Sequence, residues 1–160
     1  SSLITRNERS GALPALTDTP TNISTHDSFF ALPAVAAGGG GIPVIRKPDG
    51  SLRPRPAVID KDAASCLLAQ ELGANKLVFS TDVDKVSLNL GTPEQQDLDR
   101  ITAAECRRYL DEGHFATGSM RPKIEAALDF LDAGGEEVII TQPHLLGEAM
   151  RGGQGTHIVP

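Results

Sequence analysis

Residues 57–65 read Ala-Val-Ile-Asp-Lys-Asp-Ala-Ala-Ser, an apolar run that ends in three charged residues and continues in a helical pattern. A strand that ends in Asp-Lys-Asp delivers one cation and two carboxylates to the start of a helix, where backbone amides can also face an anion. Alternatively, Asp60 or Asp62 simply caps the helix. Three further polar segments favour a site over capping alone: residues 38–41 (Gly-Gly-Gly-Gly), 80–84 (Ser-Thr-Asp-Val-Asp) and 118–123 (Gly-Ser-Met-Arg-Pro-Lys).

Length and composition favour one soluble globular domain. A chain of 160 residues is long enough to bury a proper core, and 39% hydrophobic with 22% charged residues is typical of such domains. No apolar run approaches the ~20 residues that span a bilayer. Residues 1–10 carry charges where a signal peptide would have its apolar core. We therefore expect a cytoplasmic protein without a membrane partner.

The charge of the chain argues against a nucleic-acid-binding protein, and the arrangement of its cysteines and histidines argues against a metal-binding protein. A net charge of −6 opposes a nucleic-acid partner, whose affinity depends on Lys and Arg meeting phosphates, and the absence of Trp leaves little for base stacking. Cys66 and Cys106 lie among aliphatic residues in helical patterns, so we interpret both as packing residues. The four histidines are scattered and do not pair with the cysteines, so the sequence predicts no metal site.

The start of the chain differs in pattern from the rest. Residues 1–28 show neither a helical period nor an alternation and are interpreted as loop. We therefore expect an irregular N-terminal arm at residues 1–30 and one domain at residues 31–160. Residues 29–37 predict a buried strand that leads into the glycine run, where the backbone must closely approach something.

The middle of the chain predicts a hairpin, a helix and a strand. Pro48-Asp49-Gly50 is a turn signal between two strands at residues 42–46 and 51–55. Residues 62–72 predict a helix that Gly73 ends, and residues 76–80 predict a strand of the parallel type. The predicted apolar face of that helix comprises Ala63, Ala64, Leu67, Leu68 and Leu72.

The last third predicts two long helices, two strands and a short helix. Thr102-Ala-Ala-Glu105 is a capping box for a helix that reaches about residue 111. Ser119 is predicted to cap the next helix, whose first turn tolerates Pro122. Strands at 137–141 and 156–159 and a short helix at 145–150 complete the predicted elements.

Strands that alternate with helices at these lengths predict parallel crossovers and a three-layer α/β/α fold with a mainly parallel sheet. In such sheets ligands bind outside the carboxyl ends of the strands, where the polar segments fall. Glycine amides and two lysines suit phosphoryl transfer, in which catalysis is mostly positioning and neutralisation of charge. The chain contains neither the P-loop pattern nor a Rossmann glycine fingerprint followed by a helix.

Several segments, in this order and spacing, resemble the carbamate kinases of the amino-acid kinase superfamily. They are residues 38–44 (Gly-Gly-Gly-Gly-Ile-Pro-Val), 57–62, 72–74 (Leu-Gly-Ala), 81–84, 113–115 (Gly-His-Phe), 118–123 and 155–160 (Gly-Thr-His-Ile-Val-Pro). The resemblance runs from about residue 34 to residue 160. It implies a truncated carbamate kinase-like or acetylglutamate kinase-like fold, of which this chain carries the C-terminal, nucleotide-binding half. It also implies reversible phosphate transfer from ATP to carbamate, which gives ADP and carbamoyl phosphate.

The resemblance assigns roles to individual residues. Lys61 would stabilise the transferring phosphoryl group, Asp60 would hold the active-site lysines in place, and Lys123 would contact the nucleotide phosphates. Mg²⁺ would accompany ATP or ADP with few protein ligands. The remaining implied contacts are Thr81, Asp82, Val83, Asp84 and Met120 for the nucleotide, and Gly38, Gly39, Gly40 and Gly41 for the carbamate or the transferred phosphate.

The chain also departs from the family pattern. Family members are much longer, and their first half carries another glycine-rich loop and another lysine that residues 1–32 lack. We therefore expect very weak or no catalysis by this chain alone, and a non-catalytic nucleotide-binding or interaction module is the alternative. Arg121 replaces a family glycine and would either add a phosphate contact or crowd the site. An uncovered sheet edge at residues 29–37 predicts association of the chain with itself or with a missing first half.

Overall fold

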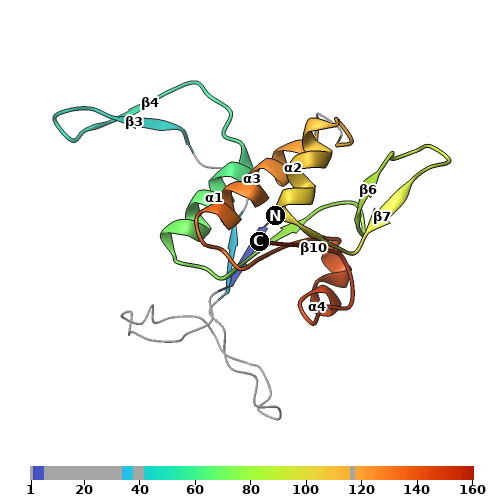
Figure 1. The fold of residues 1–160 in the computed structure, drawn as a ribbon. Coiled ribbons are helices and arrows are strands. Elements are labelled where there is room, and N and C mark those ends of the chain that lie inside the picture. The colour runs from blue at the N-terminus through green and yellow to red at the C-terminus, as the bar shows by residue number, and fades with distance from the viewer. Residues whose placement is uncertain (1, 6–33, 38–41, 116–117) are drawn as a thin grey trace, which may run out of the picture.

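The computed structural model describes residues 2–5, 34–37, 42–115 and 118–160, and Figure 1 shows the course of the chain. In chain order its elements are β1 (Ser2–Thr5), β2 (Ala34–Ala37), β3 (Val44–Arg46), β4 (Leu52–Pro54), α1 (Lys61–Glu71), β5 (Lys76–Ser80), β6 (Val86–Leu88), β7 (Gln96–Leu98), β8 (Arg100–Thr102), α2 (Ala103–Asp111), α3 (Met120–Asp132), β9 (Glu137–Thr141), the 3-10 helix η1 (Pro143–Leu145), α4 (Leu146–Ala149) and β10 (Thr156–Val159). Most predicted elements are confirmed. The strands β6, β7 and β8 lie where the sequence predicts no element.

Six strands form one sheet in the order β2-β1-β5-β9-β10-β8. The central strands β5 and β9 run parallel, with Ser80 opposite Thr141, and β8 and β10 are also parallel. The pairs β1–β2, β1–β5 and β9–β10 are antiparallel. The sheet is therefore mixed. The parallel crossover between β5 and β9 is confirmed. The connection through η1 and α4 instead leads to β10, which runs beside β9 in the opposite direction.

Strand β1 corrects the interpretation of residues 1–28 as loop. Residues Ser2–Thr5 lie inside the sheet, between β2 and β5. Four residues are too few to show a period, so only their long-range pairing reveals the strand. The part of the predicted strand at residues 29–37 that the structure describes forms β2, and the glycine run at residues 38–41 lies outside the described residues.

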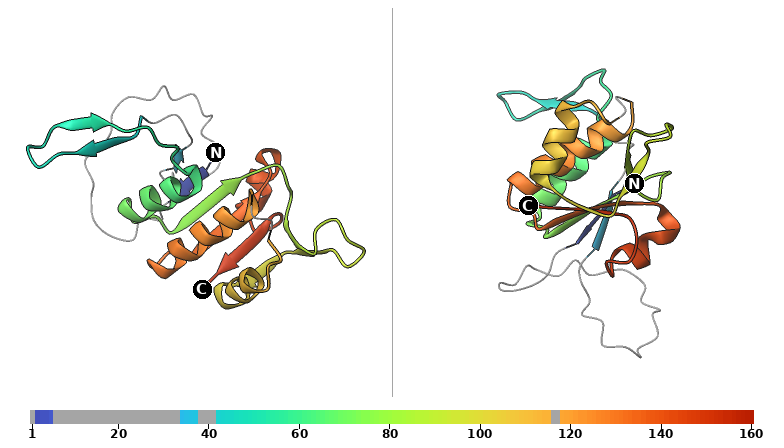
Figure 2. Two further views of the ribbon diagram at one scale, coloured as in Figure 1. Left: turned by 90° about the horizontal axis from the view of Figure 1, so that it is seen from above. Right: turned by 45° about the vertical axis from the view of Figure 1, so that its right-hand side comes forward.

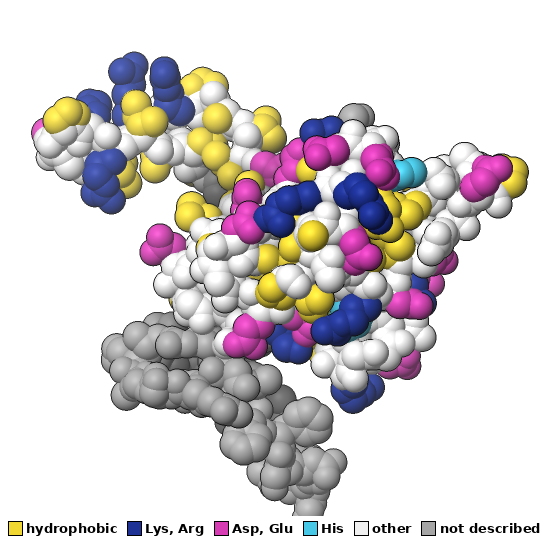
Figure 3. All heavy atoms as spheres, viewed as in Figure 1, with side chains coloured by type: hydrophobic (Ala, Val, Ile, Leu, Met, Phe, Trp, Pro, Cys, Tyr) yellow, Lys and Arg dark blue, Asp and Glu magenta, His cyan; other side chains and the backbone are white. Residues whose placement is uncertain are grey.

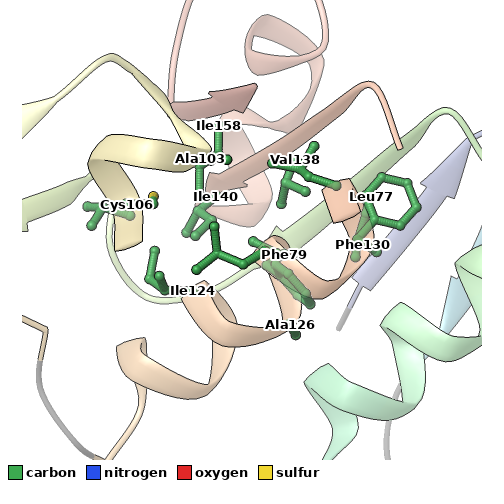
Figure 4. Packing of buried hydrophobic residues seen from close by; sticks show 14 of the residues in the cluster. Leu77, Phe79, Ala103, Cys106, Ile124, Ala126, Phe130, Val138, Ile140 and Ile158 are labelled. Carbon is green, nitrogen blue, oxygen red and sulfur yellow. The ribbon is translucent and has the colours of Figure 1, made fainter. Parts of the chain in front are cut away.

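Helices lie on both faces of the sheet, as Figures 1 and 2 show: α1, α2 and α3 on one face and α4 on the other. Because successive strand side chains point to opposite faces, Phe79 of β5 packs in the larger core with Ile124 of α3, whereas Val78 packs with Ala149 of α4. The larger core is shown in Figure 4. The predicted three-layer α/β/α arrangement is confirmed.

Local signals set most helix ends. Asp60 caps α1, and the predicted capping box of α2 is present, because Thr102 Oγ1 accepts from the amide of Glu105 and the Glu105 carboxylate accepts from the amide of Thr102. Ser119 occupies the N-cap position of α3 but makes no side-chain cap hydrogen bond, so its predicted capping role is wrong. Its backbone is outside the extended region that capping requires, with φ −129° and ψ −42°.

The apolar face predicted for α1 is turned away from the core. Leu67 is 58% exposed, and Leu68 and Leu72 are also exposed. The buried residues of α1 are Asp62, Ser65, Cys66 and Ala69. The helix was expected to bury its largest side chains. In the described chain it instead packs small and polar residues against α3, and its leucines face outward.

Two hairpins extend from the body of the molecule, β3–β4 and β6–β7 (Figure 1). The β3–β4 turn forms as predicted: Gly50 has a positive φ of 82°, and the amide of Lys47 donates to the carbonyl of Ser51 at 2.8 Å. Both strands of β3–β4 are exposed along their whole length. No helix within the described ranges is long and apolar enough to cross a bilayer.

Candidate active site

Asp60 anchors the start of α1. Its Oδ1 accepts hydrogen bonds from the amides of Asp62 at 2.8 Å and Ala63 at 2.9 Å. The capping interpretation of this carboxylate is therefore confirmed. Lys61 is the first residue of the helix, and its side chain is exposed. Its role towards a phosphoryl group stays a prediction, as does the assignment of Asp60 to hold the lysines.

A buried ion pair joins the first turn of α1 to the first turn of α3. Lys123 Nζ lies 2.9 Å from Asp62 Oδ2, and each side chain is 6% exposed. Nζ also lies 3.5 Å from the carbonyl of Ser119. Lys123 is thus held by a carboxylate that the sequence interpretation left without a role. The Asp-Lys-Asp triplet pointed to this location, but it could not show which of its two carboxylates turns inward.

A pocket of about 180 Å³ lies between the turn after β5 and the start of α3. Neither Asp62 nor Lys123 lines it, but Ser119 does, and the carbonyl of Ser119 lies 3.5 Å from Lys123 Nζ. The pocket brings together three of the predicted nucleotide contacts, Asp82, Val83 and Met120. Asp84 is exposed in the same turn but does not line the pocket. Ser119, His114 and Phe115 also line it; they belong to the segments 118–123 and 113–115 that the sequence singled out, although no role was assigned to them in the site. The sequence interpretation missed Lys85, Ser87 and Leu90.

Hydrogen bonds from β9 and its C-terminal extension hold the turn after β5. The amide of Thr81 donates to the carbonyl of Thr141 at 2.9 Å, and Gln142 Nε2 donates to the carbonyl of Asp82 at 3.1 Å. The hydroxyl of Thr81 donates to Asp82 Oδ1 at 3.1 Å. Since Ser80 and Thr141 end adjacent parallel strands, the pocket lies at the carboxyl edge of the sheet, where ligands of α/β proteins bind.

Polar contacts also fix the far wall of the pocket. His114 Nδ1 lies 3.1 Å from Asn89 Oδ1, and the His114 ring meets Tyr109 edge to face with 5.7 Å between centroids. The hydrogen bond that Lys85 donates to Asp99 raises the pKa of the Lys85 ammonium. The wall therefore combines the Phe115 ring, the His114 imidazole and the Lys85 ammonium around a partly apolar cavity.

Not all of the predicted site residues are gathered by the fold. No hydrogen bond or ion pair within the described ranges links the Lys61 side chain to Lys123 or to the pocket. Arg121 turns along α3, and its Nε donates to Glu125 at 2.8 Å. In this structure the Arg121 side chain therefore pairs with a residue of its own helix, α3. Gly38, Gly39, Gly40 and Gly41 lie outside the described residues.

Residues 22–142 match the family model described as the amino acid kinase family. The chain belongs to the amino acid kinase family. Among its relatives, the carbamate kinase-like protein YahI of Escherichia coli (strain K12) is 54% identical over 125 residues, which are 78% of this chain and 40% of YahI. The carbamate kinase of Halobacterium salinarum is 44% identical over 128 residues, which are 80% of this chain and 41% of the relative.

Solved structures of this kinase family share the fold. The carbamate kinase of Giardia lamblia bound to AMP-PNP matches with a TM-score of 0.72 and 40% identity, over 76% of this chain and 42% of that chain. The described fold is therefore a truncated carbamate kinase-like α/β fold. The chain spans about two fifths of the length of these amino acid kinase relatives.

No three His, Cys, Asp or Glu side chains in the described ranges gather so that they could hold a metal ion. Asp62, the buried carboxylate of the site, is already engaged by Lys123. Mg²⁺ usually keeps several waters and binds through substrate phosphates with one or two carboxylates. Asp82, which lines the pocket, and the exposed Asp84 of the same turn fit that limited role.

Proposed function

We propose that this chain supplies the nucleotide-binding side of a carbamate kinase-like phosphotransferase, which converts ATP and carbamate to ADP and carbamoyl phosphate and back. One observation carries the proposal: the Lys123 ammonium, which Asp62 holds at 2.9 Å, lies 3.5 Å from the carbonyl of Ser119, and Ser119 lines the pocket at the carboxyl edge of the sheet. A fixed cation at that edge suits the neutralisation of phosphate charge. The bound AMP-PNP of the Giardia lamblia kinase, a relative of the same fold, supports the choice of ligand.

The pocket would receive the base end of the nucleotide. At about 180 Å³ it is smaller than the roughly 300–1,000 Å³ that enclose a whole drug-sized ligand. Val83, Phe115 and Met120 supply its apolar surface, and Lys85 supplies a charge at its wall. The triphosphate would extend from the pocket towards the N-terminus of α3, where Lys123 lies.

Lys123 keeps capacity for a phosphate. An ammonium has three N–H donors. Asp62 and the carbonyl of Ser119 account for two of them, at 2.9 and 3.5 Å. The third remains for an oxygen of the nucleotide, while Asp62 keeps the ammonium in place. Asp62 therefore acts as a positioning residue in this proposal, a role that the resemblance had given to Asp60.

The other assigned groups complete the proposal. Lys61 would stabilise the migrating phosphoryl group, and the amides of residues 38–41 would face carbamate or the transferred phosphate. Mg²⁺ would neutralise phosphate charge when bound with the nucleotide. A cytoplasmic location, and association of the chain with itself or with a missing part of the fold, belong to the same proposal.

A non-catalytic nucleotide-binding or interaction module is the second candidate. The observation that favours it is that no hydrogen bond or ion pair within the described ranges links the Lys61 side chain to Lys123 or to the pocket. Such a module would keep the fold while catalysis is lost. If substitution of Lys61 and of Lys123 leaves nucleotide binding unchanged, this result would favour an interaction module that no longer uses nucleotides.

Calorimetric titration tests the proposed nucleotide site. ATP or ADP with Mg²⁺ is titrated into the chain and into Lys123→Ala, and we expect binding that the substitution weakens by about 1.5–3 kcal/mol, the usual worth of a hydrogen bond to a charged group. Lys47→Ala is the matched control, because this lysine is exposed on the β3–β4 hairpin. The absence of any heat at millimolar nucleotide would contradict the proposal.

A further inference from the structure

A second cavity, which we call the polar cavity, lies at the turn that leads from α4 into β10 (Figure 1). Its volume is about 360 Å³, within the roughly 300–1,000 Å³ that small-molecule sites occupy. His157 lies opposite Ile139, which packs with Ala149 of α4, so the cavity is on the α4 face of the sheet. Of the described residues, only Lys85 lines both this cavity and the pocket that we assign to the nucleotide. The polar cavity is therefore a separate place for a ligand. Its lining comprises Lys85, Asp99, Arg100, Glu137, His157 and the turn at residues 152–155.

Hydrogen bonds fix one wall of the polar cavity. His157 is 7% exposed, its Nδ1 lies 2.8 Å from Glu137 Oε1, and its Nε2 lies 3.0 Å from the carbonyl oxygen of Gln154. The other carboxylate oxygen of Glu137 accepts a hydrogen bond from Lys76. Both oxygens of Glu137 therefore have partners, and His157 ties the turn at Gln154 to the sheet. The wall is thus held in place before any ligand binds.

The charges around the polar cavity leave one cation in excess, with the imidazole counted as neutral. Lys85 pairs with Asp99, and Lys76 pairs with Glu137. Arg100 reaches a carboxylate only at 3.9 Å, from its Nη1 to Glu137 Oε1. Figure 3 shows side chains of both charges close together in the part of the molecule where β10 and α4 lie in Figure 1. A bound anion would therefore balance the guanidinium of Arg100.

Three separate segments of the chain bring uncommitted hydrogen-bond donors to the polar cavity. The Arg100 side chain at the start of β8 is 65% exposed, and its guanidinium carries five N–H donors. Lys85, just before β6, has three N–H donors, of which Asp99 takes one. The amide of Gln154, before β10, donates to no oxygen among the described residues. These donors can converge on one ligand group that has several acceptor oxygens.

We propose that the polar cavity binds a small organic phosphate, whose phosphate group is held by Arg100, Lys85 and the amide of Gln154. The planar guanidinium of arginine matches two phosphate oxygens, and backbone amides in a turn form concave sites for anions. A phosphate monoester offers three acceptor oxygens, whereas a carboxylate offers two, so phosphate suits three donor groups better. The volume of about 360 Å³ leaves room for the organic part of the molecule. Binding in this cavity would be independent of the proposed nucleotide site.

A titration followed by nuclear magnetic resonance tests the binding and locates it. Glycerol phosphate is added to the isotope-labelled full chain at constant ionic strength. We expect saturable shifts of the amide signals of residues 153–155, and affinity at least about tenfold weaker in Arg100→Ala, which loses a hydrogen bond to a charged group. Arg108→Ala is the matched control, because this arginine is exposed on α2, and it should leave the affinity unchanged. Glycerate, which carries a carboxylate in place of the phosphate, should bind more weakly.

Three outcomes would overturn the proposal. Shifts confined to residues 81–83 and 118–123 would place the phosphate at the proposed nucleotide site instead. Shifts that grow without saturation would indicate adventitious association only, and glycerate that binds as tightly as glycerol phosphate would contradict the assignment to phosphates. If the spectrum shows that Arg100→Ala is misfolded, Arg100→Gln replaces it with the same expected loss of affinity. The titration contains no nucleotide, so its failure is distinguishable from a failure of the calorimetric test at Lys123.

Discussion

At the scale of single residues, the Asp62–Lys123 pair is a buried contact of the fold, and it also holds the lysine to which we assign a nucleotide contact. Both residues are almost completely buried, at 4% and 5% exposure, and they are 61 positions apart in the sequence. Burial of two charges is costly unless they pair well, and removal of one partner leaves the other uncompensated. The pair therefore fixes the geometry of the site and also makes the fold sensitive to its loss.

Substitution of one partner should be more damaging than substitution of both. We expect Asp62→Ala to lower the free energy of unfolding by about 3–5 kcal/mol, and the double variant Asp62→Ala, Lys123→Met to lose less, because no buried charge is left alone. Urea denaturation measures both values. Asp111→Ala, at an exposed carboxylate of α2, should change stability by no more than about 0.5 kcal/mol. A double variant as unstable as the single one would contradict this reasoning.

Glu137 makes stability depend on pH. Burial acts to raise the pKa of this carboxyl, but the hydrogen bonds from Lys76 and His157 outweigh it, so the pKa is lowered from 4.5. A carboxyl with a lowered folded pKa stabilises the protein above its unfolded pKa, and this stabilisation is lost as the pH falls below about 4.5 and through the folded pKa. We expect thermal melts of Glu137→Gln to decline less steeply with acid than those of the unmodified chain. Parallel declines would mean that other carboxyls govern acid unfolding.

At the scale of elements, the turn that leads into β10 depends on close backbone approach. A Cβ at Gly155 would lie 2.9 Å from the carbonyl oxygen of Ile140, and its φ is +84°. Gly152 has nearly the same φ, +83°, but a Cβ there would meet nothing within 4 Å. The two glycines thus separate the cost of the backbone conformation from the cost of the clash.

Alanine at these two positions gives a matched comparison. Gly152→Ala should cost about 1–2 kcal/mol for the left-handed conformation, and Gly155→Ala should cost about 1–3 kcal/mol more, since β10 must shift away from β9. Chemical denaturation of both variants measures the difference. Equal losses would show that the β9–β10 pair accommodates the methyl group without strain.

At the scale of the whole molecule, the proposed catalysis would need groups that the described residues do not bring together. Loss of one preorganised donor at a transition state costs about 10²–10³ in rate. We therefore expect very weak or no ATP formation from carbamoyl phosphate and ADP by this chain alone, measured in a coupled assay. Family-like rates that Lys61→Ala abolishes would show that residues 1–33 or a partner supply the missing groups. Rates unaffected by Lys61→Ala would point to a contaminating kinase.

The sequence by itself determined the parts of this protein that local chemistry encodes. A cap or a turn requires groups only two to four residues apart, so the capping box at Thr102 and the turn at Gly50 could be predicted. The apolar runs of β5 and β9 and the lengths of the segments between strands gave the α/β class. The motifs also predicted a site at the carboxyl edge of the sheet, because that rule follows from the order of strands and helices alone.

Only the tertiary structure decided which side chains meet. It placed Ser2–Thr5 inside the sheet, turned Asp62 inward while Leu67 remained exposed, and paired Asp62 with Lys123. Each of these results depends on contacts between residues far apart in the chain, and a local pattern contains no information about them. The prediction of the buried face of α1 was wrong for the same reason. A helical period shows that one face is apolar, but the surrounding fold decides which face is buried.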